Sequence, residues 1–107
     1  MIWTDRHDEI CCEIFIDKVL QRDFCSAKTK AECIKLAKEM GLPHSEGSIS
    51  MKFQNITAIC DDKKIPHNSP FKALSNYSKK GLMCFEKVYA KHLLNLITNL
   101  TNENSEA

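Results

Sequence analysis

The segment from Ser45 to Cys60 constrains the fold most, because apolar residues recur along it at helical spacing on two sides. The first apolar stripe consists of Ile49, Phe53, Ile56 and Cys60. Met51 and Ala58 lie on roughly the opposite side of the same helix. A helix that is apolar on two sides is usually surrounded by its neighbours. We therefore predict that this segment is the central helix of a small helical domain. Its remaining face carries Ser48, Lys52 and Asn55.

A first helix is predicted near the N-terminus. Thr4 is a good N-cap, and the acidic residues after it suit the positive end of a helix dipole. The apolar periodicity continues to about Leu20 or Arg22. Trp3, just before the cap, is assigned to packing against the core.

A second helix is predicted to begin within residues 27–30, where Thr29 and Glu32 have capping-box spacing. Gly41 supplies the left-handed stop, and Pro43 cannot continue the helix. Since Ser45 caps the central helix, the two helices are joined by a short turn. This is the layout of a helix-turn-helix, in which the second helix enters the major groove of DNA.

The spacing fits the tight form of that motif only in part. Ala37 and Gly41 stand at the expected positions, but the aliphatic residue that should follow is Ile49, two residues late. The turn is therefore longer than in the tight form, as in looser trihelical variants.

A polar loop is predicted from Asp61 to Asn76. Three apolar residues should hold it against the core: Ile65, Phe71 and Leu74. His67 and Asn68 within it raise the possibility of a nuclease site. Such a site needs further metal ligands in a compact arrangement, so we assign no catalysis to the loop.

The last helix begins after Ser75 or Ser78, and from Leu93 onward it is too apolar for a lone surface helix. Two alternatives follow: this part crosses the core, or it pairs with another subunit or a protein partner. The residues available for such a contact are Leu93, Leu96, Ile97 and Leu100.

Together these segments predict an all-α fold, a compact bundle of four to five helices with a helix-turn-helix-like core. With 107 residues there is room for one domain, here residues 1–100, followed by a polar tail at 101–107 that we expect to be disordered. Only three glycines and three prolines argue against an architecture of strands and turns. No segment approaches the length of a membrane span, and no signal peptide is recognised, so we expect a cytoplasmic protein.

Six cysteines occur without any C-x-x-C pair. The strong zinc pattern is therefore absent, and a cytosolic protein is not expected to carry a disulfide framework. We interpret the cysteines as buried free thiols that act as small hydrophobic side chains. The alternative is a scattered metal site using His7, His44 or His67. We predict no cofactor.

Charge is unevenly distributed, although the net charge of the chain is only +1. Residues 28–80 hold ten lysines and five acidic residues, a net charge of +5. This basic middle coincides with the central helix and its approach, which is compatible with a polyanionic partner. The alternative is a lysine-rich surface that contacts only water.

Two strings resemble a known family. Residues 47–59, G-S-I-S-M-K-F-Q-N-I-T-A-I, resemble the G-S-V-x-M-K-L-x-N-L-x-A-L segment in the N-terminal helical regions of some bacterial HNH-endonuclease-type restriction proteins. Residues 74–79, L-S-N-Y-S-K, resemble the L-S-N-x-S-K that follows there. The likeness covers nearly all of residues 3–90 and implies a DNA-associated accessory domain. The nuclease chemistry of those proteins belongs to a separate C-terminal domain, so cleavage is not implied. A phage or mobile-element origin is compatible with this resemblance.

The favoured hypothesis is a small non-catalytic DNA-binding protein. Its contacts to bases and phosphates are assigned to Lys35, Lys38, Ser48, Lys52, Asn55, Lys79 and Lys80. The alternative hypothesis is a protein-interaction module or inhibitor that acts on a nuclease or defence complex and dimerises through the C-terminal helix. An enzyme is not favoured, because no catalytic triad, phosphate-binding loop or H-E-x-x-H motif is present.

Overall fold

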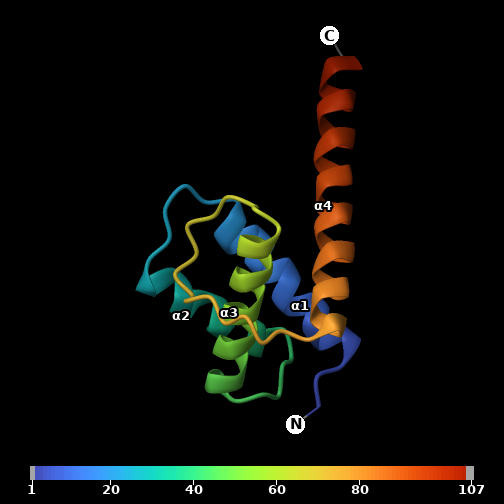
Figure 1. The fold of residues 1–107 in the computed structure, drawn as a ribbon. Coiled ribbons are helices and arrows are strands. Elements are labelled where there is room, and N and C mark those ends of the chain that lie inside the picture. Colours follow the sequence, from blue (N-terminus) through green and yellow to red (C-terminus); the bar gives the residue numbers. More distant parts are fainter. Residues whose placement is uncertain (1, 106–107) are drawn as a thin grey trace.

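The computed structural model describes the backbone of residues 2–105 and the side chains of residues 2–101 (Figure 1). Its helices are α1 (Asp5–Phe15), α2 (Ala27–Glu39), α3 (Glu46–Asp62) and α4 (Lys79–Ser105). A π-helical segment, η1 (Ile16–Leu20), continues α1. The described residues contain no strand. The predicted all-α fold is therefore confirmed.

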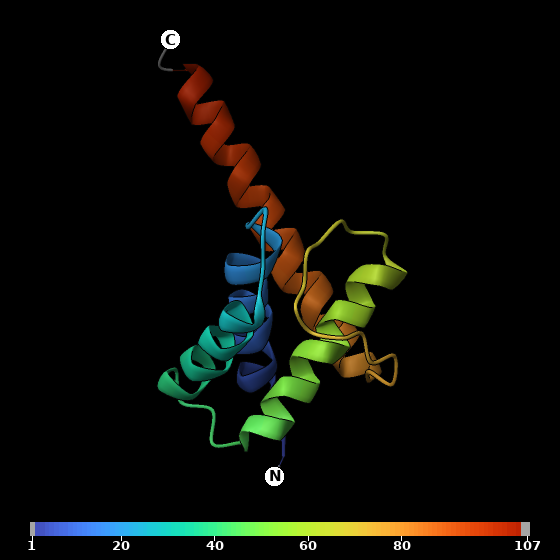
Figure 2. The same cartoon turned by 90° about the vertical axis from the view of Figure 1, so that its left-hand side faces the viewer.

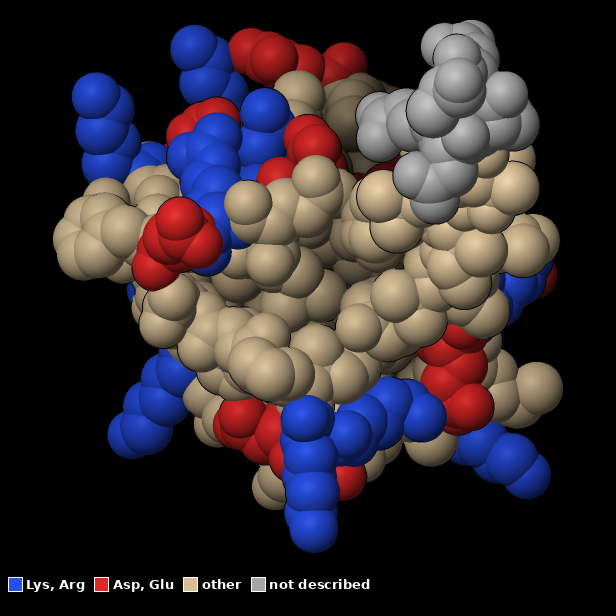
Figure 3. Space-filling view, turned by 90° about the horizontal axis from the view of Figure 1, so that it is seen from above, with Lys and Arg blue, Asp and Glu red and all other residues tan. Residues whose placement is uncertain are grey.

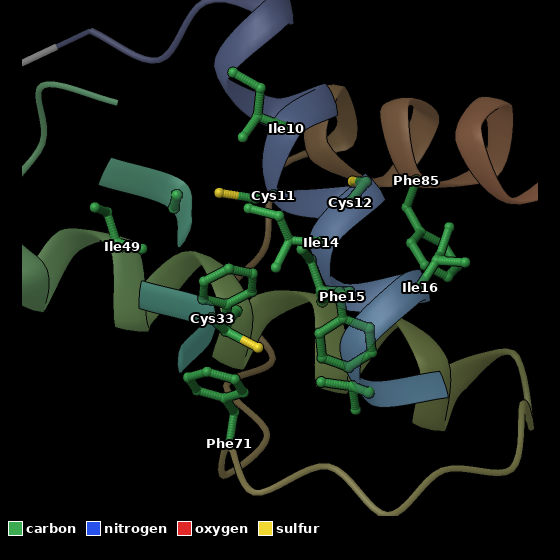
Figure 4. Packing of buried hydrophobic residues seen from close by; sticks show 14 of the residues in the cluster. Ile10, Cys11, Cys12, Ile14, Phe15, Ile16, Cys33, Ile49, Phe71 and Phe85 are labelled. Atoms are coloured by element: carbon green, nitrogen blue, oxygen red, sulfur yellow. The ribbon is translucent and has the colours of Figure 1, made fainter. Parts of the chain in front are cut away.

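The helices α1, α2 and α3 pack together with the first half of α4 into a compact unit, which we call the body (Figures 1 and 2). Both α1 and α3 pack against every other helix, as expected for α3 from its two apolar sides. Figure 4 shows side chains from α1, α2 and α3 meeting Phe71 and Phe85 in one cluster. The largest side chains of this core are Phe15, Phe53, Phe71 and Phe85, and all four are buried.

Side-chain caps set the starts of the first three helices. Thr4 caps α1, and its hydroxyl accepts a hydrogen bond from the His7 backbone N–H at 3.2 Å. Ser45 caps α3 in the same way, as predicted. The helix α2 begins at Ala27, within the predicted range, but its capping box is not the Thr29–Glu32 pair. Ser26 is the N-cap, and Thr29 is its capping-box partner, because its hydroxyl accepts a hydrogen bond from the Ser26 N–H.

The end of α2 follows its glycine. Gly41 has a φ of 105°, a left-handed conformation that side chains with a Cβ rarely adopt. Its N–H donates to the Lys38 carbonyl, and the N–H of Leu42 donates to the Ala37 carbonyl. These bonds satisfy the last carbonyls of α2 and turn the chain toward α3.

A long loop, residues 63–78, lies along α3 and covers part of it. Phe71 stacks on Phe53 with ring centroids 4.9 Å apart. The Leu74 N–H donates to the Gln54 carbonyl, and the hydroxyls of Thr57 and Ser69 lie 2.7 Å apart. The predicted anchoring of this loop to the core is confirmed for Phe71, which is buried, whereas Ile65 and Leu74 are half-buried.

The second half of α4 leaves the body (Figures 1 and 2). It gives the molecule extents of 49 × 28 × 27 Å. Every residue from Leu93 to Thr101 is exposed. Of the two alternatives for this segment, a path through the core is therefore excluded.

The polar tail predicted for residues 101–107 is helical as far as Ser105, and residues 106 and 107 lie outside the described part of the chain. None of the described helices carries an apolar run long enough to cross a bilayer.

Candidate functional site

A buried ion pair joins α1 to α3. Lys52 Nζ lies 2.9 Å from Asp8 Oδ1, with exposed side-chain fractions of 14% and 3%. The ammonium also lies 4.7 Å from the centre of the Trp3 ring, within the range of a cation–π contact. Lys52 is therefore neutralised inside the protein.

Aromatic rings close this ion pair off at the N-terminal end of α1. Trp3 stacks on His44 with ring centroids 3.9 Å apart, and His7 meets His44 edge-on at 4.8 Å. His44 is buried, and its Nε2 lies 3.2 Å from the Ile2 carbonyl oxygen. Trp3 therefore packs against the core, as predicted, and its partner is His44.

Lys80 and Asn55 lie at the edge of the same cluster. Lys80 Nζ donates to the Trp3 carbonyl at 2.7 Å and lies 3.4 Å from Asp5 Oδ1 and 4.0 Å from Asp8 Oδ2. Asn55 Oδ1 is buried without a hydrogen-bond partner among the described residues. It lines an internal cavity of about 10 Å³ together with Asp8 and Lys52. Two of the seven predicted contact residues, Lys52 and Lys80, thus lie within 4.0 Å of the Asp8 carboxylate, and Asn55 lines the cavity beside it.

The other four predicted contact residues lie elsewhere. Lys35 and Lys38 are exposed on α2, and Lys35 lies 3.9 Å from Glu39. Ser48 is exposed in the first turn of α3, and Lys79 is exposed at the start of α4. Figure 1 places α2 and α4 on opposite sides of the body. The structure therefore does not bring the seven residues together on one surface.

Charge is mixed across the face seen in Figure 3, where Lys and Arg side chains alternate with Asp and Glu around the rim. The ion pairs include Lys63 with Glu86 and Lys80 with Asp5, at 3.5 and 3.4 Å. The basic character that the sequence shows for residues 28–80 is thus partly neutralised by acidic residues from both ends of the chain.

Little of α3 is accessible on the surface of the molecule. The exposed residues of α3 before its last turn are Glu46, Gly47, Ser48 and Met51. The remainder packs inward or lies under the loop of residues 63–78. Only the first turns of α3 could approach a nucleic acid, and that end carries the negative charge of Glu46.

An unpartnered apolar surface lies on the free half of α4. We call it the α4 strip; it consists of Leu93, Leu94, Leu96, Ile97 and Leu100, whose exposed fractions run from 41% to 63%. Sequence reasoning named four of these five residues and missed Leu94, which stands in the same L-L-N-L-I run.

The α4 strip faces a different direction from the buried side of α4. At roughly 100° of rotation per residue, its centre lies about 100° around the helix axis from the side formed by Phe85, Val88 and His92. It continues instead into a shallow pocket between α4 and the loop of residues 63–78. That pocket is lined by Lys63, Ile65, Phe85, Glu86, Tyr89, Ala90 and Leu93. Leu93 therefore belongs to both the strip and the pocket.

The other residues that the sequence offered for a catalytic or metal site, His67 and the cysteines, are found in structural surroundings. His67 Nε2 lies 2.6 Å from Asp61 Oδ1, and its Nδ1 accepts from the Ser69 N–H. Four cysteines are buried and two, Cys25 and Cys84, are half-buried, all as free thiols. No group of three or more His, Cys, Asp or Glu residues is placed to hold a metal ion in the described part of the chain.

Comparison of the chain with protein-family models, curated proteins and solved structures gives no match.

Proposed function

We propose that this chain is a non-catalytic interaction protein, that it docks through the α4 strip, and that the partner is a second copy of itself. The supporting observation is the free half of α4, which leaves the body and exposes five large aliphatic side chains on one face. Soluble monomers rarely expose a contiguous apolar surface of this kind. It is therefore our candidate docking surface.

The chemistry of the strip favours a second copy. No charged residue occurs between Lys91 and Glu103, so two strips meet without repulsion between like charges. In an antiparallel pair that crosses near Leu96 and Ile97, Leu93 of one copy lies opposite Leu100 of the other. Such an arrangement is isologous, because the same surface is used on both copies.

The strip is small beside a standard protein–protein interface, because it consists of five aliphatic side chains that are already partly covered. Interfaces at the low end of the size range belong to weak complexes. We therefore expect a dimer that dissociates in the micromolar range, at about 1–100 μM.

The test is the molar mass in solution, measured by light scattering at about 10–200 μM protein. Wild type should approach twice the chain mass of 12.2 kDa at the upper concentrations. Leu96→Asp should stay monomeric, because a carboxylate cannot be buried in an apolar interface. Met83→Asp is the matched control, since Met83 is 60% exposed on α4 but lies outside the strip; this variant should dimerise normally. A wild type that is monomeric throughout, or a dimeric Leu96→Asp, would contradict the proposal.

DNA binding remains a second candidate, because it is the function that the resemblance to restriction-protein domains implies. The observation that favours it is the group of exposed lysines on α2, including Lys35, whose side chain is 79% exposed. A mobility shift on random-sequence duplex at two salt concentrations tests it, using a Lys35→Ala/Lys38→Ala variant. Lys52→Ala is unsuitable for that purpose, because it would also remove the buried partner of Asp8.

A further inference from the structure

Cys12 on α1 and Cys84 on α4 both lie in the contact between these helices, because Cys12 lines a small cavity with Gly81 of α4 and Cys84 lines a cleft with Glu9 of α1. Figure 4 shows the Cys12 side chain pointing toward α4 beside Phe85, whereas the neighbouring Cys11 points the other way. Cys84 packs against the core from α4. Glu9 lies one turn before Cys12 and Lys87 lies one turn after Cys84, and their side chains form an ion pair at 3.3 Å. The two helices are therefore joined by an ion pair next to the two cysteines.

The two thiols differ in access to solvent. Cys12 is 2% exposed, whereas Cys84 is half-buried and lines an open cleft with Lys79, Lys80 and Lys87. A small reagent can therefore reach Cys84 from the cleft but cannot reach Cys12 directly.

The six cysteines also differ in pKa. The pKa of Cys84 is lowered, whereas the pKa values of the other five are raised. A hydrogen bond from the Cys12 thiol lowers the pKa of Cys84, and this effect outweighs partial burial and the nearby carboxylates of Asp8 and Glu9, which act in the opposite direction. The same hydrogen bond and burial raise the pKa of Cys12. Burial raises the pKa of Cys11 and Cys60 to about 12 and that of Cys33 to about 11, and it also raises the pKa of Cys25. The thiolate is the reactive form of cysteine, so Cys84 is the group most able to act as a nucleophile.

We propose that Cys84 and Cys12 form an oxidation site for hydroperoxides, with Cys84 as the thiol that reacts first and Cys12 as the thiol that resolves it. The Cys84 thiolate attacks one oxygen of hydrogen peroxide; an S–O bond forms, the O–O bond breaks, and hydroxide leaves. The Cys12 sulfur then attacks the Cys84 sulfenic acid, forming the S–S bond and releasing the hydroxyl as water. In total, two thiols and one peroxide give one disulfide and two waters.

The product ties α1 to α4 at the base of the free helix. It encloses most of the chain, from residue 12 to residue 84, in one covalent loop. A crosslink over so long a loop restricts the unfolded chain, so the oxidised protein should unfold at a higher temperature than the reduced one.

The experiment treats the full-length reduced protein with a small excess of hydrogen peroxide and follows thiol content and intact mass. Wild type should lose two of its six thiols and about 2 Da, reversibly with dithiothreitol. Cys12→Ser should instead gain about 16 or 32 Da, because the sulfenic acid at Cys84 has no resolving thiol. Cys84→Ser should neither form the disulfide at the rate of wild type nor gain oxygen at the rate of Cys12→Ser.

Two matched variants make the assignment specific. Cys11→Ser removes the adjacent cysteine, and Cys25→Ser removes the other half-buried one; both should form the disulfide as wild type does. If Cys12→Ser fails to fold, the surface-facing Cys84→Ser variant still decides the question. Retention of all six thiols by wild type, or disulfide formation that persists in Cys84→Ser, would overturn the proposal.

Discussion

Asp8 and Lys52 form a buried pair, and the stability it provides depends on which partner is removed. With 3% of its side chain exposed, Asp8 cannot be solvated by water and depends on the ammonium 2.9 Å away. Lys80 lies 4.0 Å from the other carboxylate oxygen and supplies partial compensation. Removing Lys52 therefore leaves a buried anion with a weaker partner, whereas removing both groups leaves no buried charge.

This asymmetry can be measured by urea unfolding. Lys52→Met should lower the free energy of unfolding by about 3 kcal/mol, the lower end for a broken buried pair because Lys80 remains. Lys35→Met is the control, since that side chain is 79% exposed, and it should change stability by less than about 0.5 kcal/mol. The double variant Asp8→Leu/Lys52→Met should recover most of the loss. A Lys52→Met protein as stable as wild type would show that the pair contributes nothing.

On the scale of the elements, two glycines flank the turn between α2 and α3, and only one of them is required there. Gly41 ends α2 at a φ of 105°, and no atom lies within 4 Å of the place where a Cβ would stand. Gly47 lies in the first turn of α3, where an added Cβ would make only ordinary contact with Ser45 Oγ at 4.0 Å. The first glycine is required for its conformation, whereas the second has no such requirement.

The two glycines should respond oppositely to alanine. Gly41→Ala should destabilise the protein by roughly 1–2 kcal/mol, because the left-handed conformation is strained for residues with a Cβ. Gly47→Ala should stabilise it by about 0.5–1 kcal/mol, because alanine loses less conformational freedom in a helix. Thermal unfolding of the two variants side by side tests both signs. Equal effects would mean that the end of α2 does not depend on Gly41.

Helix periodicity predicts the elements well here because it is a local property. The stripe of Ile49, Phe53 and Ile56 is sufficient to place α3, and Gly41 is sufficient to end α2. The contacts inside the site are not local, because they join residues that are far apart in the sequence. Asp8 has every sequence feature of a dipole-stabilising first-turn residue, and only the packing of α3 on α1 buries it against Lys52. A lysine read from sequence as a surface cation is therefore satisfied internally by a residue 44 positions away.

For the molecule as a whole, the sequence could not choose between a buried and a projecting α4. The aliphatic run from Leu93 to Leu100 is compatible with both arrangements. A buried α4 covers the run inside the core, and a projecting α4 covers it against a partner. The choice depends on whether the body already has a closed core, and α1, α2 and α3 supply one together with the first half of α4. The remainder of α4 has no place left in that core.

Because the second half of α4 lies outside the body, the stability of this part of the helix depends on whether the protein dimerises. The free half of α4, Leu93–Ser105, has no support from the body, and an isolated helix of that length is marginal in water. If the α4 strip pairs with a second copy, the helix is stabilised only in the dimer. Dilution from about 200 μM to 1 μM should then remove roughly one sixth of the helical circular-dichroism signal per residue. Leu96→Asp should show the lower signal at every concentration. A wild-type signal independent of concentration, together with a monomeric mass, would mean that α4 holds its full length alone and that the strip does not mediate dimerisation.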